Sequence, residues 1–93
     1  MKNTLIALLL PYGFETRQDT LFWGCGSYFS GGATVEVTAK GGMVQMVCHR
    51  WLYDQYGECV YDTTTTTVCH LSQVWENLPQ SVYDWHAYLM RRA

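Results

Sequence analysis

Two groups of side chains in this sequence have the chemical types that active sites and metal sites use. The first is a histidine and a carboxylate, His49 and Asp62, which lie on two consecutive predicted strands. If the turn between those strands is tight at residues 55–56, the two side chains face each other, and the carboxylate can orient the imidazole for acid–base chemistry. Such chemistry also needs a nucleophile, and only threonines of ordinary strands lie nearby. We therefore interpret the pair as a cross-strand contact worth roughly a few tenths of a kcal/mol, and we expect no enzyme.

The second group consists of thiols and an imidazole that can ligate a metal ion, namely Cys48, Cys59, Cys69 and His70. Their spacing lacks the close cysteine or histidine pairs that zinc sites typically contain. Adjacent residues on a strand point to opposite faces, so each Cys-His pair can give one ligand to a site. A small metal-binding or redox domain built on these residues is the alternative hypothesis. The leading hypothesis, developed below, involves no cofactor.

Four cysteines in a short chain also raise the question of disulfides. The predicted strand registers place Cys25 on the opposite face of the sheet from Cys48. They place Cys59 about 13 Å along the sheet from the residue opposite Cys48. That separation exceeds the reach of a disulfide, so the sequence predicts free thiols and a reducing cytoplasm.

The elements that must position these residues are predicted from hydrophobic alternation and glycine turns. Residues 33–40 alternate apolar with polar side chains, and Gly41-Gly42 then gives a two-residue hairpin signal. A run rich in β-forming residues follows at 43–53, and another ends in five consecutive threonines. The predicted strands are residues 20–30, 33–40, 43–53 and 58–67, with a connection at 15–19.

The ends of the chain are predicted to be mostly helical. Residues 3–10 fit either a short helix or a buried strand, and a helix is predicted at 73–78. Ser81 and Asp84 match a capping box that opens a last helix, whose apolar face carries Val82. A helix must cover one face of the sheet. The predicted fold is thus one α+β domain, residues 1–93: a four-stranded antiparallel meander packed on a C-terminal helix in two layers.

Tight turns fix which residues share a face. They set Tyr28 opposite Val35, Val35 opposite Cys48, and Cys48 opposite Thr63. The predicted core face then carries Val35, Val37, Ala39, Val44, Met46, Cys48, Leu52 and Tyr61. The other face carries Trp23, Phe29, Val47, Trp51 and Val60 among Thr34, Glu36, Thr38, Gln45, His49, Asp62 and Thr64. Either the N-terminal segment covers this second, aromatic face, or the face binds a partner.

Composition narrows the functional classes. Apolar residues make up 48 % of the chain and charged residues 15 %, which excludes a disordered segment. The net charge is −2 and the basic residues are scattered, so we expect no direct binding to nucleic acid. The first ten residues contain a short apolar run, but Pro11 follows instead of a small-residue cleavage site. The run is also too short to span a bilayer, so we expect a core element and a cytoplasmic protein.

These observations favour a non-enzymatic protein-binding module, because four Trp and seven Tyr are typical of binding hot spots. The predicted partner-binding residues are Trp23, Phe29, Glu36, His49, Trp51 and Asp62. In size, mildly acidic composition and sheet-plus-helix layout, the chain resembles the small inhibitor proteins of phages and mobile elements, of the anti-CRISPR type. The resemblance covers no motif. It implies a host defence (CRISPR-Cas type) component as partner, masked in the host cytoplasm by a monomer or homodimer.

Overall fold

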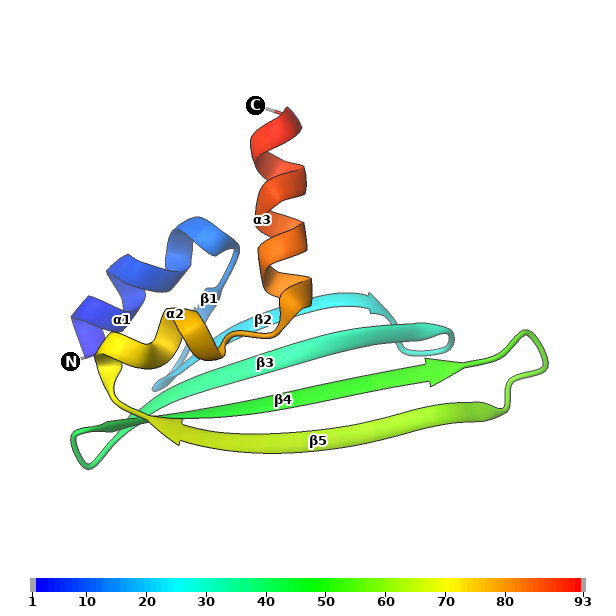
Figure 1. Cartoon of the computed structure of the whole chain (residues 1–93), viewed down its shortest axis with the longest axis horizontal. Helices are drawn as coiled ribbons and strands as arrows, with labels where there is room; N and C mark the ends of the chain where they lie inside the picture. Colours follow the sequence, from blue (N-terminus) through cyan, green and yellow to red (C-terminus); the bar gives the residue numbers. More distant parts are fainter. Residues whose placement is uncertain (1, 93) are drawn as a thin grey trace.

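A five-stranded antiparallel sheet with strand order β1-β2-β3-β4-β5 forms one layer, and helices form the other (Figure 1). The computed structural model describes residues 2–92. Its elements are α1 (Lys2–Leu9), the 3-10 helix η1 (Leu10–Tyr12), β1 (Glu15–Arg17), β2 (Thr20–Ser27), β3 (Gly31–Lys40), β4 (Met43–Tyr53), β5 (Cys59–Cys69), the 3-10 helix η2 (Leu71–Gln73), α2 (Val74–Asn77) and α3 (Gln80–Arg92). The α+β class, the antiparallel sheet and the C-terminal helices are confirmed, but the sheet has five strands instead of four.

The strand that the sequence did not reveal is β1, in the segment predicted to be a connection. It pairs with β2, with Glu15 opposite Phe22 and Arg17 opposite Thr20. All three of its residues are exposed, so it has no alternating apolar pattern by which to recognise it. Its side chains are nevertheless ordered by local contacts, because the Arg17 guanidinium lies 3.8 Å from the centre of the Phe22 ring.

The register between β3 and β4 is as predicted, with Val35 opposite Cys48 and Val37 opposite Met46. The register between β4 and β5 differs by two residues, so that Cys48 lies opposite Thr65. The connection is longer than a two-residue turn because the Asp54 carboxylate accepts hydrogen bonds from the backbone N–H groups of residues 56 and 58. Side chains alternate with a period of two, so this shift leaves residues 61–67 of β5 on their predicted faces. At the start of β5 the pairing shifts by one residue at a bulge, because Cys59 lies opposite Tyr53 and Val60 is the extra residue.

The turn between β2 and β3 was predicted wrongly. Gly31 and Gly32 begin β3, and the turn consists of residues 28–30. The glycines allow a close approach of two strands, because a Cβ atom on Gly32 would lie 2.4 Å from the carbonyl oxygen of Cys25. Val35 consequently pairs with Trp23 instead of Tyr28. This difference of five residues is odd, so it exchanges the faces of β2 and turns Trp23 toward the core.

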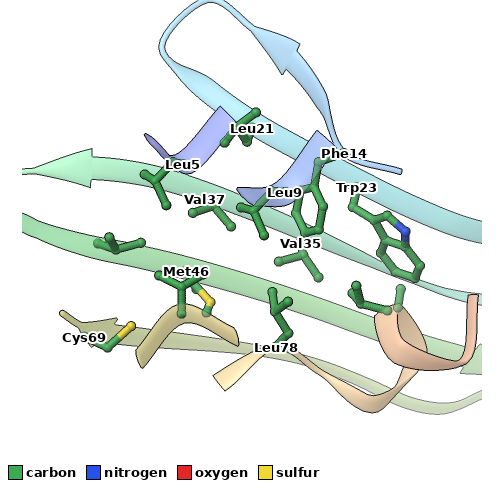
Figure 2. Packing of buried hydrophobic residues seen from close by; sticks show 14 residues of the cluster. Leu5, Leu9, Phe14, Leu21, Trp23, Val35, Val37, Met46, Cys69 and Leu78 are labelled. Carbon is green, nitrogen blue, oxygen red and sulfur yellow. The ribbon is translucent and has the colours of Figure 1, made fainter. Parts of the chain in front are cut away.

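The helices cover one face of the sheet, and the hydrophobic core lies between the two layers. Figure 2 shows Leu9 of α1, Phe14 and Trp23 pointing into the same cluster as Val35. The N-terminal segment is therefore a helix on the core side. Eight residues are too few for a stable isolated helix, so α1 depends on this packing. No element among residues 2–92 covers the opposite side of the sheet, which we call the outer face.

The helices reach over only part of the sheet. The distal ends of β4 and β5 extend beyond them (Figure 1), and Leu52 and Tyr61 on the predicted core face are 39 % and 40 % exposed. Val82 in the first turn of α3 is fully buried, whereas the rest of α3 projects away from the sheet and leaves Trp85 38 % exposed.

The predicted capping box at Ser81 is absent. The last helix starts at Gln80, two residues before the start that a Ser81 cap predicts, so Ser81 lies inside the first turn. Its hydroxyl is buried without a hydrogen-bond partner, while Asp84 accepts a hydrogen bond from the Gln80 side chain. Within residues 2–92, no helix has the length and apolar character needed to cross a membrane.

Candidate functional site

Three of the predicted partner-binding residues, His49, Trp51 and Asp62, meet in a cleft on the outer face. The cleft has a volume of about 240 Å³ and is lined by Tyr28, Thr34, His49, Trp51, Tyr53 and Asp62. Strands β3, β4 and β5 supply five of these side chains, and the β2–β3 turn supplies Tyr28. The cleft therefore combines three aromatic rings, an imidazole and a carboxylate on rigid neighbouring strands.

Trp51 is held in one orientation by its neighbours. It lies opposite Gly32 on β3, and its indole Nε1–H donates a 2.9 Å hydrogen bond to the backbone carbonyl of Ser27. A Cβ atom on Gly32 would lie 2.9 Å from Trp51 Cζ2, so only glycine leaves room for the indole to lie across β3. The ring is half-buried. Its exposed side is thus presented to solvent with little rotamer freedom left to lose on binding.

His49 and Asp62 form the contact that the sequence predicted, although by a diagonal route. His49 lies opposite Thr64, and Asp62 lies opposite Trp51. The distance from His49 Nε2 to Asp62 Oδ1 is 2.6 Å, with side-chain exposures of 40 % and 47 %. A contact this exposed contributes about 0–1 kcal/mol to stability. Its main effect is to fix the carboxylate in the cleft while engaging one of its two oxygens.

The aromatic walls of the cleft are packed against each other. The rings of His49 and Trp51 are 4.9 Å apart at an interplanar angle of 36°. The pKa of Tyr53 is raised above its ordinary value, most by desolvation and less by the nearby Cys59, Asp62 and Tyr28. Its phenol is thus neutral at physiological pH and can donate a hydrogen bond.

This arrangement is suited to recognising a cation. A carboxylate in a cleft lined by Trp and Tyr side chains can attract ammonium or guanidinium groups by charge and by cation–π contact. Nucleophilic catalysis assisted by His49 would require a nucleophile hydrogen-bonded to its imidazole. Among the described residues, His49 makes its one hydrogen bond to Asp62.

No family model, curated protein or solved structure matches the chain.

The other predicted partner-binding residues lie outside the cleft. Trp23 is 2 % exposed in the core, so its prediction as a surface residue is wrong. The register between β2 and β3, which differs from the predicted one by five residues, turns its side chain toward the core. Phe29 lies in the β2–β3 turn, 85 % exposed, with its ring 5.6 Å from that of Tyr28. Glu36 is exposed on the outer face, opposite Val47.

Two cleft residues were not predicted as binding residues. Tyr53 is two positions after Trp51 on the same strand, so the period of two was sufficient to place it on the outer face. Tyr28 comes from the β2–β3 turn, whose position the sequence predicted wrongly. No signal in the sequence placed it beside β4.

A shallower groove extends the site toward β1. It has a volume of about 430 Å³, its floor includes Gly24 and Gly26, and it shares Thr34 and Trp51 with the cleft. At its far end lies Arg17, paired with Glu15. The cleft and the groove thus adjoin on the outer face, where they share Trp51.

The alternative metal-binding residues are dispersed. Cys59 and Cys69 are the two ends of β5, roughly 34 Å apart at the usual rise per residue. Burial raises the pKa of the Cys69 thiol, and it raises that of Cys48 more than nearby Arg50 lowers it. Within residues 2–92, no three His, Cys, Asp or Glu side chains are grouped to hold a metal ion. The backbone N–H of His70 donates a hydrogen bond to the side-chain oxygen of Gln73.

The four cysteines are separate thiols in the structure. Contrary to prediction, Cys25 lies on the same face as Cys48, because the changed β2 register sets it opposite Ala33. The two positions are still two strands apart and offset by two residues, so they lie beyond the reach of a disulfide.

Proposed function

We propose that this chain is a small, non-enzymatic protein-binding module that docks through the outer face of its sheet. In this proposal the cleft around Trp51 accepts a lysine or arginine side chain of the partner. The supporting observation is the Asp62 carboxylate held among Tyr28, Trp51 and Tyr53 on a face that no described element covers. Antiparallel sheets usually present a polar face to water, so this concentration of aromatic rings calls for a binding role.

The size of the cleft favours a side chain over a free small molecule. Its volume of about 240 Å³ is below the 300–1,000 Å³ or so of typical ligand pockets. A single cation–π contact contributes about 0.5–2 kcal/mol, which is too little for specific recognition without further contacts. Those contacts would come from the adjoining groove and from the exposed Glu36 carboxylate.

The inhibitor role implied by the resemblance is proposed as the way in which such a surface would act. Proteins that bind nucleic acid do so largely through lysine and arginine side chains. A cleft that binds such side chains would mask the nucleic-acid site of its partner, as an inhibitor of a host defence complex requires. In that case the partner's affinity for its nucleic acid should fall when this protein is added, and should recover with the Asp62→Asn variant.

The docking proposal is tested by comparing two carboxylates. Asp62→Asn keeps the shape of the side chain and removes its charge, so affinity for the partner should fall roughly 10- to 100-fold, as for loss of a charge-assisted hydrogen bond. Asp84→Asn is the matched control, because Asp84 is exposed, accepts one side-chain hydrogen bond and lies on α3.

The measurement is calorimetric titration of each purified variant into the partner, which is first captured from the source cell and identified by mass spectrometry. The proposal expects a loss for Asp62→Asn alone. Equal affinities for both variants and the wild type would exclude the cleft as the docking site.

A further inference from the structure

The free edge of β5 is unusually open for a natural sheet. This strand has eleven residues, forms one end of the sheet, and contains neither proline nor glycine. Figure 1 shows no described element beyond it. Nine of its eleven residues are exposed, including Val60 at 56 % and Val68 at 59 %. Its backbone N–H and C=O groups on that side are therefore available to pair with another strand.

The opposite edge of the sheet is shorter and more highly charged. β1 has three residues, and two of them, Glu15 and Arg17, are charged. Short length and charge are the usual means by which natural sheets prevent edge-to-edge pairing. On β5, by contrast, Asp62 is the one charged residue, and it is engaged with His49. The contrast indicates that β5 is kept open for pairing.

We propose that β5 pairs antiparallel with β5 of a second copy of this chain, around a two-fold axis at Thr64. A second copy is favoured as the partner because the sequence of β5 is complementary to itself about this axis. β5 is regular from Tyr61 onward, after the bulge at Val60. With Thr64 opposite itself, this regular part pairs with the same residues of the second copy, Tyr61 with Thr67 and Thr63 with Thr65, each twice by symmetry. Asp62 then lies opposite Thr66 of the second copy. Centring the pairing on Asp62 would instead set two carboxylates opposite each other, which is unfavourable.

This pairing also covers surface that the monomer leaves bare. The start of β5, before the bulge at Val60, lies beside the last residues of β5 of the second copy, from which the chain leaves the sheet toward η2 and α2. The uncovered distal end of one β4–β5 hairpin is thus placed beside the helix-covered end of the other. Tyr61, 40 % exposed on the core side, becomes the neighbour of Thr67 of the second copy.

The axis is perpendicular to the sheet, so both outer faces point the same way. The dimer therefore carries two of the clefts described above on one side of a continuous ten-stranded sheet. Pairing of two β5 edges is independent of the proposed function, because it involves the edge of the sheet and not the cleft.

The first test uses charges at the symmetry axis. Thr64→Lys and Thr64→Glu each set two like charges opposite each other across the interface, whereas Thr16→Lys puts the same lysine on the opposite edge strand. Light scattering after size-exclusion chromatography should give the wild type and Thr16→Lys about twice the chain mass of 10.7 kDa. Each Thr64 variant should dissociate at least about tenfold more readily, and an equimolar mixture of the two should recover the dimer.

Three results would overturn the proposal: a wild type that stays monomeric at millimolar concentration, equal effects of Thr64→Lys and Thr16→Lys, or no recovery in the mixture. Thr64 is exposed in the single chain, so circular dichroism should show that these variants are folded.

The second test concerns the register. Thr64→Cys places two introduced thiols opposite each other, whereas in Thr66→Cys the introduced thiols are about 14 Å apart along the strand. Mild oxidation should join the Thr64→Cys pair, and peptide mass spectrometry distinguishes that disulfide from those of native cysteines. The disulfide should form at least about tenfold faster than in Thr66→Cys. Equal rates would overturn the axis at Thr64.

Discussion

Replacing Leu9 with alanine should destabilise the protein strongly, whereas the same replacement at Leu10 should not. Leu9 is the last residue of α1 and is fully buried against the sheet, while Leu10 begins η1 and is 48 % exposed. Truncating a fully buried leucine costs about 2–5 kcal/mol through lost burial and the cavity left behind. For a domain of this size, a loss of about 3 kcal/mol lowers the melting temperature by roughly 12–24 °C. Surface truncations are usually within about 0.5 kcal/mol of neutral.

The two variants are compared by urea unfolding monitored by circular dichroism, which gives the free energy of unfolding of each. The adjacent leucines have the same chemistry and nearly the same place in the chain, so a difference between them measures burial alone. Equal unfolding free energies for Leu9→Ala and Leu10→Ala would refute the packing of α1 on the core face. The N-terminal segment would then be free to cover the outer face, where it would compete with a partner.

Two further outcomes are expected. Ser81→Ala should be neutral or stabilise the protein by up to about 2 kcal/mol in urea unfolding. The substitution removes a buried hydroxyl that has no hydrogen-bond partner, and alanine favours the helix. A loss of stability would instead support the capping role that the sequence suggested. In the native protein at neutral pH, a maleimide should label the exposed Cys25 at least about tenfold faster than Cys48 and Cys69. Burial disfavours the thiolates of Cys48 and Cys69 and raises the pKa of both thiols. Faster labelling of Cys69 than of Cys25 would contradict the packing of the end of β5.

Whether the sequence predicted a strand residue on the correct face of the sheet depended on whether the register error was an even or an odd number of residues. The error at the β4–β5 hairpin was two residues, so His49, Trp51 and Asp62 all stayed on the face where they were predicted. His49 and Asp62 still meet because diagonal neighbours on adjacent strands are within reach of their side chains. The error at the β2–β3 connection was five residues, and it moved Trp23 from the surface to the core.

The remaining errors come from interactions that local patterns do not record. Gly31-Gly32 resembles a hairpin turn, but its role is to let the β2 backbone and β4 side chains approach β3 closely, which depends on residues far along the chain. Three exposed residues of β1 form a strand because β2 offers them an edge. The sequence predicted the cleft in part, through residues of β4 and β5. It did not predict Tyr28 as a cleft residue, because a turn residue has no periodicity that indicates the direction of its side chain.

The central claim, that the outer-face cleft binds a basic side chain, is tested most directly by titrating the protein with blocked tripeptides and following amide and indole N–H signals by NMR. The peptides Ala-Lys-Ala, Ala-Leu-Ala and Ala-Glu-Ala differ in the central side chain alone. One cation–π contact and one exposed ion pair predict an affinity in the millimolar range or weaker for the lysine peptide. Its shifts should be confined to the residues that line the cleft and to the Trp51 indole N–H, and Asp62→Asn should abolish them. Equal shifts with the leucine or glutamate peptide, or shifts in the helical layer alone, would contradict the claim.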